Sequence, residues 1–375
     1  MTKYKILILS VGSLLGQNIL DTLEGRRKEL LIIGSNTTCD NPRILRCDKV
    51  FKSPLTSSPS FENFVKTLIE NENPDIVLPA RDHDVLFLAE FILKFPEFKA
   101  KIPCGSVEAI KIMNDKSLSY LFAKKHGLPF AETFFVSKNN FEAARSWALQ
   151  IGYPVLAKPR EGFGSLGIRI ICDEEQLEAF VKNDDEGFLL QEIIDFKAKQ
   201  HDAILEVRRN LDKGLPLFFH MPDEDQYAAQ AIIAPDGTVG RVFTSKSLMV
   251  IGRCERAQPC EDVRLEAVAR CFAEAISVEG WRGVFNFQCR KTEDGYKGIE
   301  MNGRMSGSTS ARLWLGFDEP RELIKAFQGI DIGPDARIFE DKQGVVYRSL
   351  TDYFVAEKDC EQFERNGKWE KNYET

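Results

Sequence analysis

A lysine at the end of an apolar run precedes a loop rich in glycine. Lys158 follows the apolar residues 155–157, and a second apolar run occupies residues 168–171. Three glycines and a serine lie between them, at Gly162, Gly164, Ser165 and Gly167. Glycine lets backbone N–H groups turn toward one point and approach a polyanion, because no Cβ intervenes. The segment therefore predicts a strand, a phosphate-binding loop served by the Lys158 ammonium, and a second strand.

Oxygen-bearing side chains gather on a predicted hairpin near the end of the chain. Residues 283–289 and 297–302 read as two short strands joined by a Glu-Asp-Gly turn. Alternation places Glu300 and Asn302 on one face, and Gln288 can face them from the first strand. Magnesium prefers hard oxygen donors and is normally shared with substrate phosphates. We therefore predict a magnesium site here, with two ions bridged by Glu300 and Mn²⁺ as the alternative metal.

An arginine and a run of small residues follow the predicted metal strands. Arg304 is followed by Ser306, Gly307, Ser308 and Ser310. A guanidinium can hold a carboxylate with two parallel hydrogen bonds and stabilise charge passed to an acyl phosphate. The arginine is therefore predicted to align an acid, with the small residues lining the place where a second substrate binds.

Both groups of residues resemble one known superfamily. Lys-Pro-x-x-Gly-x-Gly-Ser-x-Gly resembles the phosphate-binding loop of ATP-grasp proteins, especially the synthetase domains of carbamoyl-phosphate synthase. Asn-x-Gln followed by Glu-x-Asn-x-Arg resembles the metal strands of the same family. The resemblance implies an ATP-dependent ligase that makes an acyl phosphate, with ATP and Mg²⁺ as cofactors and Arg304 and Lys158 as catalytic residues.

The resemblance implies further nucleotide contacts. Lys116 corresponds to a lysine that approaches the α-phosphate, although by position alone it is a solvated residue of a first helical turn. Residues 187–194 resemble the hinge strand whose edge binds adenine, which implies roles for Gln191, Glu192 and Ile194. By itself, Glu192 is equally well an exposed glutamate on an edge strand.

One segment departs from the family pattern. Gln226 stands where an acidic ribose-binding residue is expected, so ribose contact is left unassigned. The extra residues 196–222, with Arg208, Arg209 and His220, are interpreted as a lid or specificity element. Nearer the N-terminus, Asp82 is interpreted first as an N-cap of the next helix, and direct contact with substrate is the second role, which could coexist with the first.

Composition limits the class of protein. The net charge of −7 argues against nucleic acid as a partner, because phosphate-backbone binding needs a basic surface. Nine cysteines without Cys-x-x-Cys spacing fit reduced thiols in the cytoplasm, and no apolar run is long enough to span a bilayer. The expected partners are small molecules, a carboxylate and a nucleophile. A homodimer is left open as the assembly.

The fold expected is α/β: an N-terminal doubly wound domain followed by a two-subdomain α+β ATP-grasp fold. The boundaries are 1–112 for the first domain, 113–186 for the subdomain with the glycine loop, and 187–375 for the subdomain with the metal strands and tail. Strands are predicted at 5–10, 30–34 and 75–79, with helices at 17–23, 61–70 and 84–95.

Three other functions were weighed. A nicotinamide-dependent dehydrogenase lacks the third glycine of the fingerprint, and Ser35 and Asn36 stand where an acidic residue would bind ribose. A bicarbonate-phosphorylating enzyme similar to carbamoyl-phosphate synthase keeps the fold and changes the acid. A nucleotide-binding regulator without turnover would not need both lysines, the metal-binding residues and Arg304.

Overall fold

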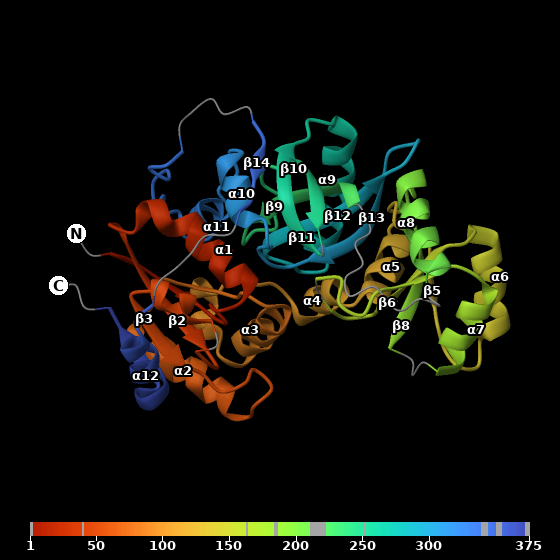
Figure 1. Cartoon of the computed structure of the whole chain (residues 1–375). Coiled ribbons are helices and arrows are strands. Elements are labelled where there is room, and N and C mark those ends of the chain that lie inside the picture. The colour runs from red at the N-terminus through yellow and green to blue at the C-terminus, as the bar shows by residue number, and fades with distance from the viewer. Residues whose placement is uncertain are drawn as a thin grey trace.

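Three β-sheets organise the protein (Figure 1). The computed structural model describes residues 3–39, 41–162, 164–183, 187–210, 223–250, 252–338, 344–349 and 355–371. Within these ranges, no helix is long and apolar enough to cross a membrane. His220 and residues 211–222 of the predicted extra segment lie outside the described residues.

The first unit is built on parallel strands in the order β3-β2-β1-β4. Its strands are almost fully apolar, as expected where helices cover both faces of a parallel sheet. The elements are β1 (Tyr4–Ile8), α1 (Leu14–Leu23), η1 (Glu24–Arg26), β2 (Leu30–Asn36), η2 (Pro42–Arg46), β3 (Lys49–Lys52), α2 (Ser60–Glu72), β4 (Ile76–Leu78), α3 (Asp82–Lys94) and η3 (Pro96–Lys101). This confirms the doubly wound opening, and it adds the short strand β3, which sequence analysis missed.

The C-terminal segment returns to this first unit. After α12 (Glu357–Asn366), strand β15 (Lys368–Glu370) pairs antiparallel with β3 and becomes the edge of the first sheet. Phe363 and Trp369 are buried there, and Figure 1 shows α12 beside the first sheet. The predicted range 187–375 placed this tail with the metal strands, whereas its contacts lie with the N-terminal sheet.

The second unit carries the glycine loop. Its antiparallel sheet has the order β5-β8-β6-β7 and is packed against α6 and α7 through buried alanine, leucine and phenylalanine side chains. The elements are α4 (Val107–Asn114), α5 (Lys116–Lys125), β5 (Thr133–Phe135), α6 (Phe141–Ile151), β6 (Val155–Pro159), β7 (Arg169–Ile171), α7 (Glu174–Asn183), β8 (Phe188–Glu192) and α8 (Ala198–Arg209). Asp115 caps α5 by accepting from the backbone N–H groups of Ser117 and Leu118, so a new helix begins at Lys116.

The third unit is a sheet in the order β13-β12-β9-β10-β11-β14. Its elements are β9 (Asp223–Ile233), β10 (Phe243–Val250), β11 (Arg253–Pro259), α9 (Val263–Val278), β12 (Gly283–Lys291), β13 (Tyr296–Asn302), α10 (Thr309–Trp314), α11 (Glu319–Gln328) and β14 (Val346–Tyr347). Phe285 and Phe287 of β12 belong to the same buried cluster as Phe272 of α9. One face of the sheet is therefore apolar and covered by α9, which leaves the opposite face for polar groups.

Sequence analysis missed β11, α10 and α11. The segment that forms β11, Arg-Cys-Glu-Arg-Ala-Gln-Pro, has no apolar alternation, and pairing with β10 makes it a strand. The six residues of α10 are too few to give a helical period in the sequence.

Candidate active site

The glycine loop uses backbone conformations that explain its composition. Gly162, Gly164 and Gly167 have φ values of 140°, 63° and 76°. Residues that carry a Cβ rarely adopt positive φ values, so glycine is the residue that fits these positions. Ser165 also has a positive φ, of 60°, which is uncommon for a residue with a Cβ. The loop is exposed between β6 and β7, as the sequence predicted.

Lys116 contacts the loop directly. It is the first residue of α5 and is only 7% exposed. Its Nζ donates to the Gly162 carbonyl at 3.2 Å, and its backbone N–H donates to the Arg160 carbonyl at 2.9 Å. Lys116 is therefore a largely buried lysine at the base of the glycine loop, and the interpretation as a solvated residue is wrong.

The Lys158 ammonium donates a hydrogen bond to a buried side-chain amide on the neighbouring strand. Its side chain is 7% exposed, and its Nζ donates to Gln191 Oε1 at 2.7 Å. Gln191 is fully buried on the adjacent strand β8 and donates through Nε2 to Thr133 Oγ1 at 3.3 Å. In this structure Gln191 orients the lysine.

The predicted hinge residues connect the second unit to the third. Glu192 Oε1 accepts from Lys297 Nζ and from the Glu132 backbone N–H, both at 2.8 Å. The backbone N–H of Gly298 in β13 donates to the Pro129 carbonyl at 2.9 Å. Ile194 follows β8 and packs, partly buried, against the large apolar cluster. The end of β8 thus lies beside β13, the strand that carries the predicted metal ligands.

The glycine loop also touches the third sheet. A Cβ added to Gly252, at the turn between β10 and β11, would lie 2.6 Å from the carbonyl oxygen of Gly164. Such a distance requires backbone-to-backbone approach and excludes any side chain at Gly252 in this arrangement. The glycine loop therefore meets the third sheet at the turn between β10 and β11.

The open face of the third sheet carries amides around one carboxylate. In the ladder of β12 and β13, Gln288 pairs with Glu300, and Asn286 pairs with Asn302. Asn302 Nδ2 donates to Glu300 Oε1 at 3.2 Å, and Asn302 is only 3% exposed. The structure thus brings the three predicted metal-binding side chains together on one face.

Two glutamines of β9 extend this polar face, and sequence analysis did not assign them to it. Gln226 Nε2 donates to Gln288 Oε1 at 2.5 Å, and Gln230 Nε2 donates to Asn286 Oδ1 at 2.8 Å. Within the described part of the chain, Gln230 Oε1 is buried and has no hydrogen-bond partner. Gln226 and Gln230 are four residues apart on a strand and so lie on one face, which was the sequence signal that could have placed them together. Gln226 lies beside the predicted metal ligands.

The donor set fits magnesium shared with a nucleotide. Among the described residues, no three or more His, Cys, Asp or Glu side chains converge as a metal cluster. One carboxylate surrounded by amide oxygens supplies hard ligands but little charge, so phosphate oxygens would complete the coordination. The unpaired oxygen of Gln230 is a further buried acceptor close to this set.

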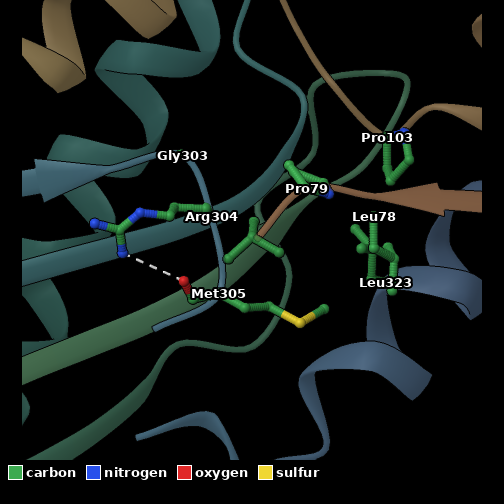
Figure 2. A pocket seen from close by; sticks show the side chains of 8 residues that line it. Leu78, Pro79, Pro103, Gly303, Arg304, Met305 and Leu323 are labelled. Atoms are coloured by element: carbon green, nitrogen blue, oxygen red, sulfur yellow. Dashed lines mark hydrogen bonds between the residues drawn. The ribbon is translucent and has the colours of Figure 1, made fainter. Parts of the chain in front are cut away.

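Arg304 is paired with a carboxylate of the first unit. Its Nε and Nη2 donate to Asp82 Oδ1 and Oδ2 at 2.5 and 3.0 Å, and its Nη1 donates to the Met305 carbonyl at 3.3 Å. Figure 2 shows the Arg304 side chain extending away from Leu78 and Leu323. Asp82 is the first residue of α3, and Arg81 is the N-cap without a side-chain bond. The interpretation of Asp82 as an N-cap is therefore wrong.

The loop after Arg304 is supported by two arginines that sequence analysis missed. Arg312, 1% exposed, donates to Ser306 Oγ at 3.0 Å and Ser308 Oγ at 2.9 Å and pairs with buried Glu319. Arg348 donates to the Gly307 carbonyl and, at 3.1 Å, to Asn18 Oδ1 of α1. Arg312 lies directly after the loop, four residues beyond Ser308, so its spacing was an available signal, whereas Arg348 comes from a distant segment.

Asp84 is a buried carboxylic acid near the Asp82–Arg304 pair. It accepts from Ser10 Oγ at 3.0 Å and from the Ala80 backbone N–H at 3.3 Å. Burial raises the pKa of Asp84 to about 6, against these hydrogen bonds and the positive charge of Arg81, which lower it. The folded protein therefore binds this proton more tightly than the unfolded chain.

We expect Asp84 to make stability depend on pH. Between about pH 4 and pH 6 the unfolded Asp84 is ionised and the folded Asp84 is not, so its stabilising contribution is lost as pH rises through about 6. The rise in the pKa of Asp84 from its ordinary value to about 6 corresponds to roughly 3 kcal/mol of unfolding free energy. Denaturant unfolding of wild type and Asp84→Asn from pH 4 to 7 measures this contribution to the unfolding free energy. The difference between the two unfolding free energies should change across this window; a constant difference contradicts the assignment.

The chain is similar to known proteins in sequence and in structure. Residues 115–187 match the family model "Carbamoyl-phosphate synthase L chain, ATP binding domain". The N-terminal section of a carbamoyl phosphate synthase large chain from Methanopyrus kandleri is 25% identical over 373 residues, covering 94% of this chain and 62% of that protein. The chain thus spans less than two thirds of this relative.

Two solved structures resemble the whole arrangement. N5-carboxyaminoimidazole synthetase from Staphylococcus aureus, complexed with ADP, has a TM-score of 0.64 and 13% identity, covering 92% of this chain and 81% of that one. Biotin carboxylase from Campylobacter jejuni, in a β-γ-ATP complex, has a TM-score of 0.61 and 20% identity, covering 88% and 72%. At these identities the likeness establishes a shared fold.

Proposed function

We propose, from the premise that this chain folds as an ATP-grasp protein, that it is an ATP-dependent ligase. In the proposed reaction a carboxylate oxygen attacks the γ-phosphorus of ATP, which releases ADP and forms an acyl phosphate. An amine or similar nucleophile then displaces phosphate from the acyl carbon. The substrates are small molecules, and little covalent chemistry is asked of the protein itself.

One observation carries the proposal. The glycine loop, which holds Lys116 through Gly162, approaches the third sheet to within backbone contact at Gly252. This contact supports a single cleft that has phosphate-binding groups on one side and oxygen ligands on the other. A triphosphate needs both, because its charge must be neutralised by cations and its geometry fixed during in-line transfer.

Each predicted residue has a role in this proposal. Lys116, Lys158 and the backbone N–H groups of Gly162, Gly164, Ser165 and Gly167 neutralise and position the phosphates. Gln191, Glu192 and Ile194 form the adenine end, where Glu192 is already held in place by Lys297. The Gln191 side chain is buried, so its proposed role is to orient the Lys158 ammonium by a hydrogen bond.

The magnesium ions belong to the opposite wall. Gln288, Glu300 and Asn302 would hold them, and Gln226 orients Gln288. When bound, the metal supplies neutralisation of the charge that develops on the transferred phosphoryl group. Arg304 is proposed to align the acid, after which the serine loop held by Arg312 borders the acyl phosphate.

Two alternatives stay within reach of experiment. Bicarbonate as the acid is favoured by the family model matched over residues 115–187 and by the Methanopyrus kandleri relative, a carbamoyl phosphate synthase large chain. A nucleotide-binding regulator would keep the fold without turnover. The presence of both lysines, the proposed metal-binding residues and Arg304 in one chain supports catalysis, because a regulator without turnover would not need all of them.

The test is an acid screen with chemical capture. The protein is incubated with ATP, magnesium and hydroxylamine and a panel of amino acids, hydroxy acids and bicarbonate. Acid-dependent hydroxamate together with ADP release is the expected result for ligation. ADP release with bicarbonate alone would select the first alternative, and ATP binding without ADP release across the panel would select the regulator.

A further inference from the structure

The Asp82–Arg304 pair occupies the place where the proposed ligase must receive its acid. The Nε and Nη2 edge of Arg304 is the fork that binds a carboxylate with two parallel hydrogen bonds, and Asp82 already fills it. The remaining terminal nitrogen donates to the Met305 carbonyl. In this structure, Asp82 therefore occupies the Nε–Nη2 edge of Arg304, which a substrate carboxylate would need for the same two parallel hydrogen bonds.

Asp82 lies on the outer side of the pair. The Arg304 side chain is 7% exposed, whereas that of Asp82 is 22% exposed. A ligand that approaches from solvent therefore meets the carboxylate of Asp82 before it meets the guanidinium. Beside the arginine, a cavity of about 10 Å³ lined by Pro79, Pro103 and Gly303 has room for no more than one water.

We propose that Asp82 is a built-in substitute for the substrate's carboxylate, which the acid displaces when it binds Arg304. This inference rests on the proposed function, because it concerns the same arginine. The exchange keeps one carboxylate on Arg304 before and after binding, so the buried guanidinium is never left unpaired, which would cost several kcal/mol. An uncharged ligand cannot make this exchange, so Asp82 selects for carboxylates.

The displaced Asp82 has a second place to go. It is the first residue of α3, whose N-cap, Arg81, makes no side-chain hydrogen bond. The first N–H groups of a helix lack partners within the helix, and the positive end of the helix dipole favours a carboxylate there. Asp82 can therefore leave Arg304 by rotating its side chain toward its own helix, without movement of the first sheet.

The opposite role for the same pair is a fixed clamp. If Asp82 only holds Arg304 in position between the first and third units, its removal should weaken the binding of an acid. If Asp82 is the displaced substitute, weakening the Asp82–Arg304 ion pair should strengthen the binding of an acid. The two roles thus predict changes of opposite sign in one measurement.

Acetate is the probe, because it carries a carboxylate and one methyl group. Calorimetric titration of acetate into wild type and Asp82→Asn needs no turnover, so it can fail while the ligase proposal stands. The asparagine keeps the size of Asp82 but loses the charge that competes for Arg304. If Asp82 occupies the fork in at least nine of ten molecules, the affinity for acetate should rise roughly tenfold or more.

Two further variants make the titration decisive. Asp84→Asn, which neutralises a carboxylate that makes no contact with Arg304, should leave acetate affinity at the wild-type value. Adding Arg304→Leu to Asp82→Asn should abolish the gain. Unchanged or weaker acetate binding in Asp82→Asn overturns the proposal, and so does a gain that survives Arg304→Leu.

The same variant links the exchange to the reaction. With an acid found in the screen, Asp82→Asn should lower the KM for that acid and leave the KM for ATP unchanged. A clamp would instead raise the KM for the acid. Wild type that releases no ADP with any acid counts against the proposed function, while the acetate titration still decides the role of Asp82.

Discussion

Glu300→Gln is expected to lower magnesium-dependent ADP release on the order of a thousandfold while the protein stays folded. Glu300 is the one carboxylate among the amides of the open face, and Asn302 holds its Oε1 at 3.2 Å. The change removes the negative charge that attracts the metal and keeps the shape and hydrogen-bonding capacity of the side chain. Initial rates of ADP release over a magnesium titration measure the effect.

Glu293→Gln is the matched control for this prediction. Glu293 lies in the exposed turn of the same hairpin, between β12 and β13, and lacks the neighbouring amides. Its neutralisation should leave the rate unchanged. Wild-type kinetics in Glu300→Gln, with thermal unfolding also unchanged, would remove the metal assignment from this face of the sheet.

Lys158→Met is expected to reduce kcat/KM for ATP by about two to three orders of magnitude. The methionine keeps the apolar stem and deletes the ammonium, which we propose contacts the phosphates. The substitution also leaves Gln191 Oε1 without the donor that lies 2.7 Å away. An unpaired buried acceptor costs about 1–3 kcal/mol, so stability should fall as well.

The loss of stability can be separated from the loss of activity. Adding Gln191→Leu to Lys158→Met removes both partners of the hydrogen bond, so it should recover much of the unfolding free energy but not the activity. Lys182→Met is the control for surface charge, because its Nζ pairs with Glu178 on the exposed side of α7. Recovery of ATP use in the double variant would mean that Lys158 serves only the fold.

Local spacing was enough to predict the parts of the site that are formed within one segment. The positive φ angles at Gly162, Gly164 and Gly167 are a property of three glycines in one loop. The pairing of Gln288 with Glu300 follows from the alternation of two strands joined by a short turn. These features depend on neighbours in the chain, which the sequence displays directly.

Contacts between distant segments could not be predicted in this way. Asp82 and Arg304 are 222 residues apart, and each has an ordinary local role by itself, at a helix start and after a strand. Gln226 was left without an assigned role, and only the placement of β9 beside β12 brings it to Gln288. Likewise, β15 carries no signal that it completes the first sheet.

The sequence by itself determined the chemistry available to this protein: a phosphate-binding loop with Lys158 at its start, and one carboxylate among amides. The tertiary structure decided which groups are free to act, because hydrogen bonding and burial assign each side chain one partner out of many. It placed Gln191 beneath Lys158 and Asp82 on Arg304. Pairing across the fold depends on how three sheets pack, and no spacing within a single segment encodes that packing.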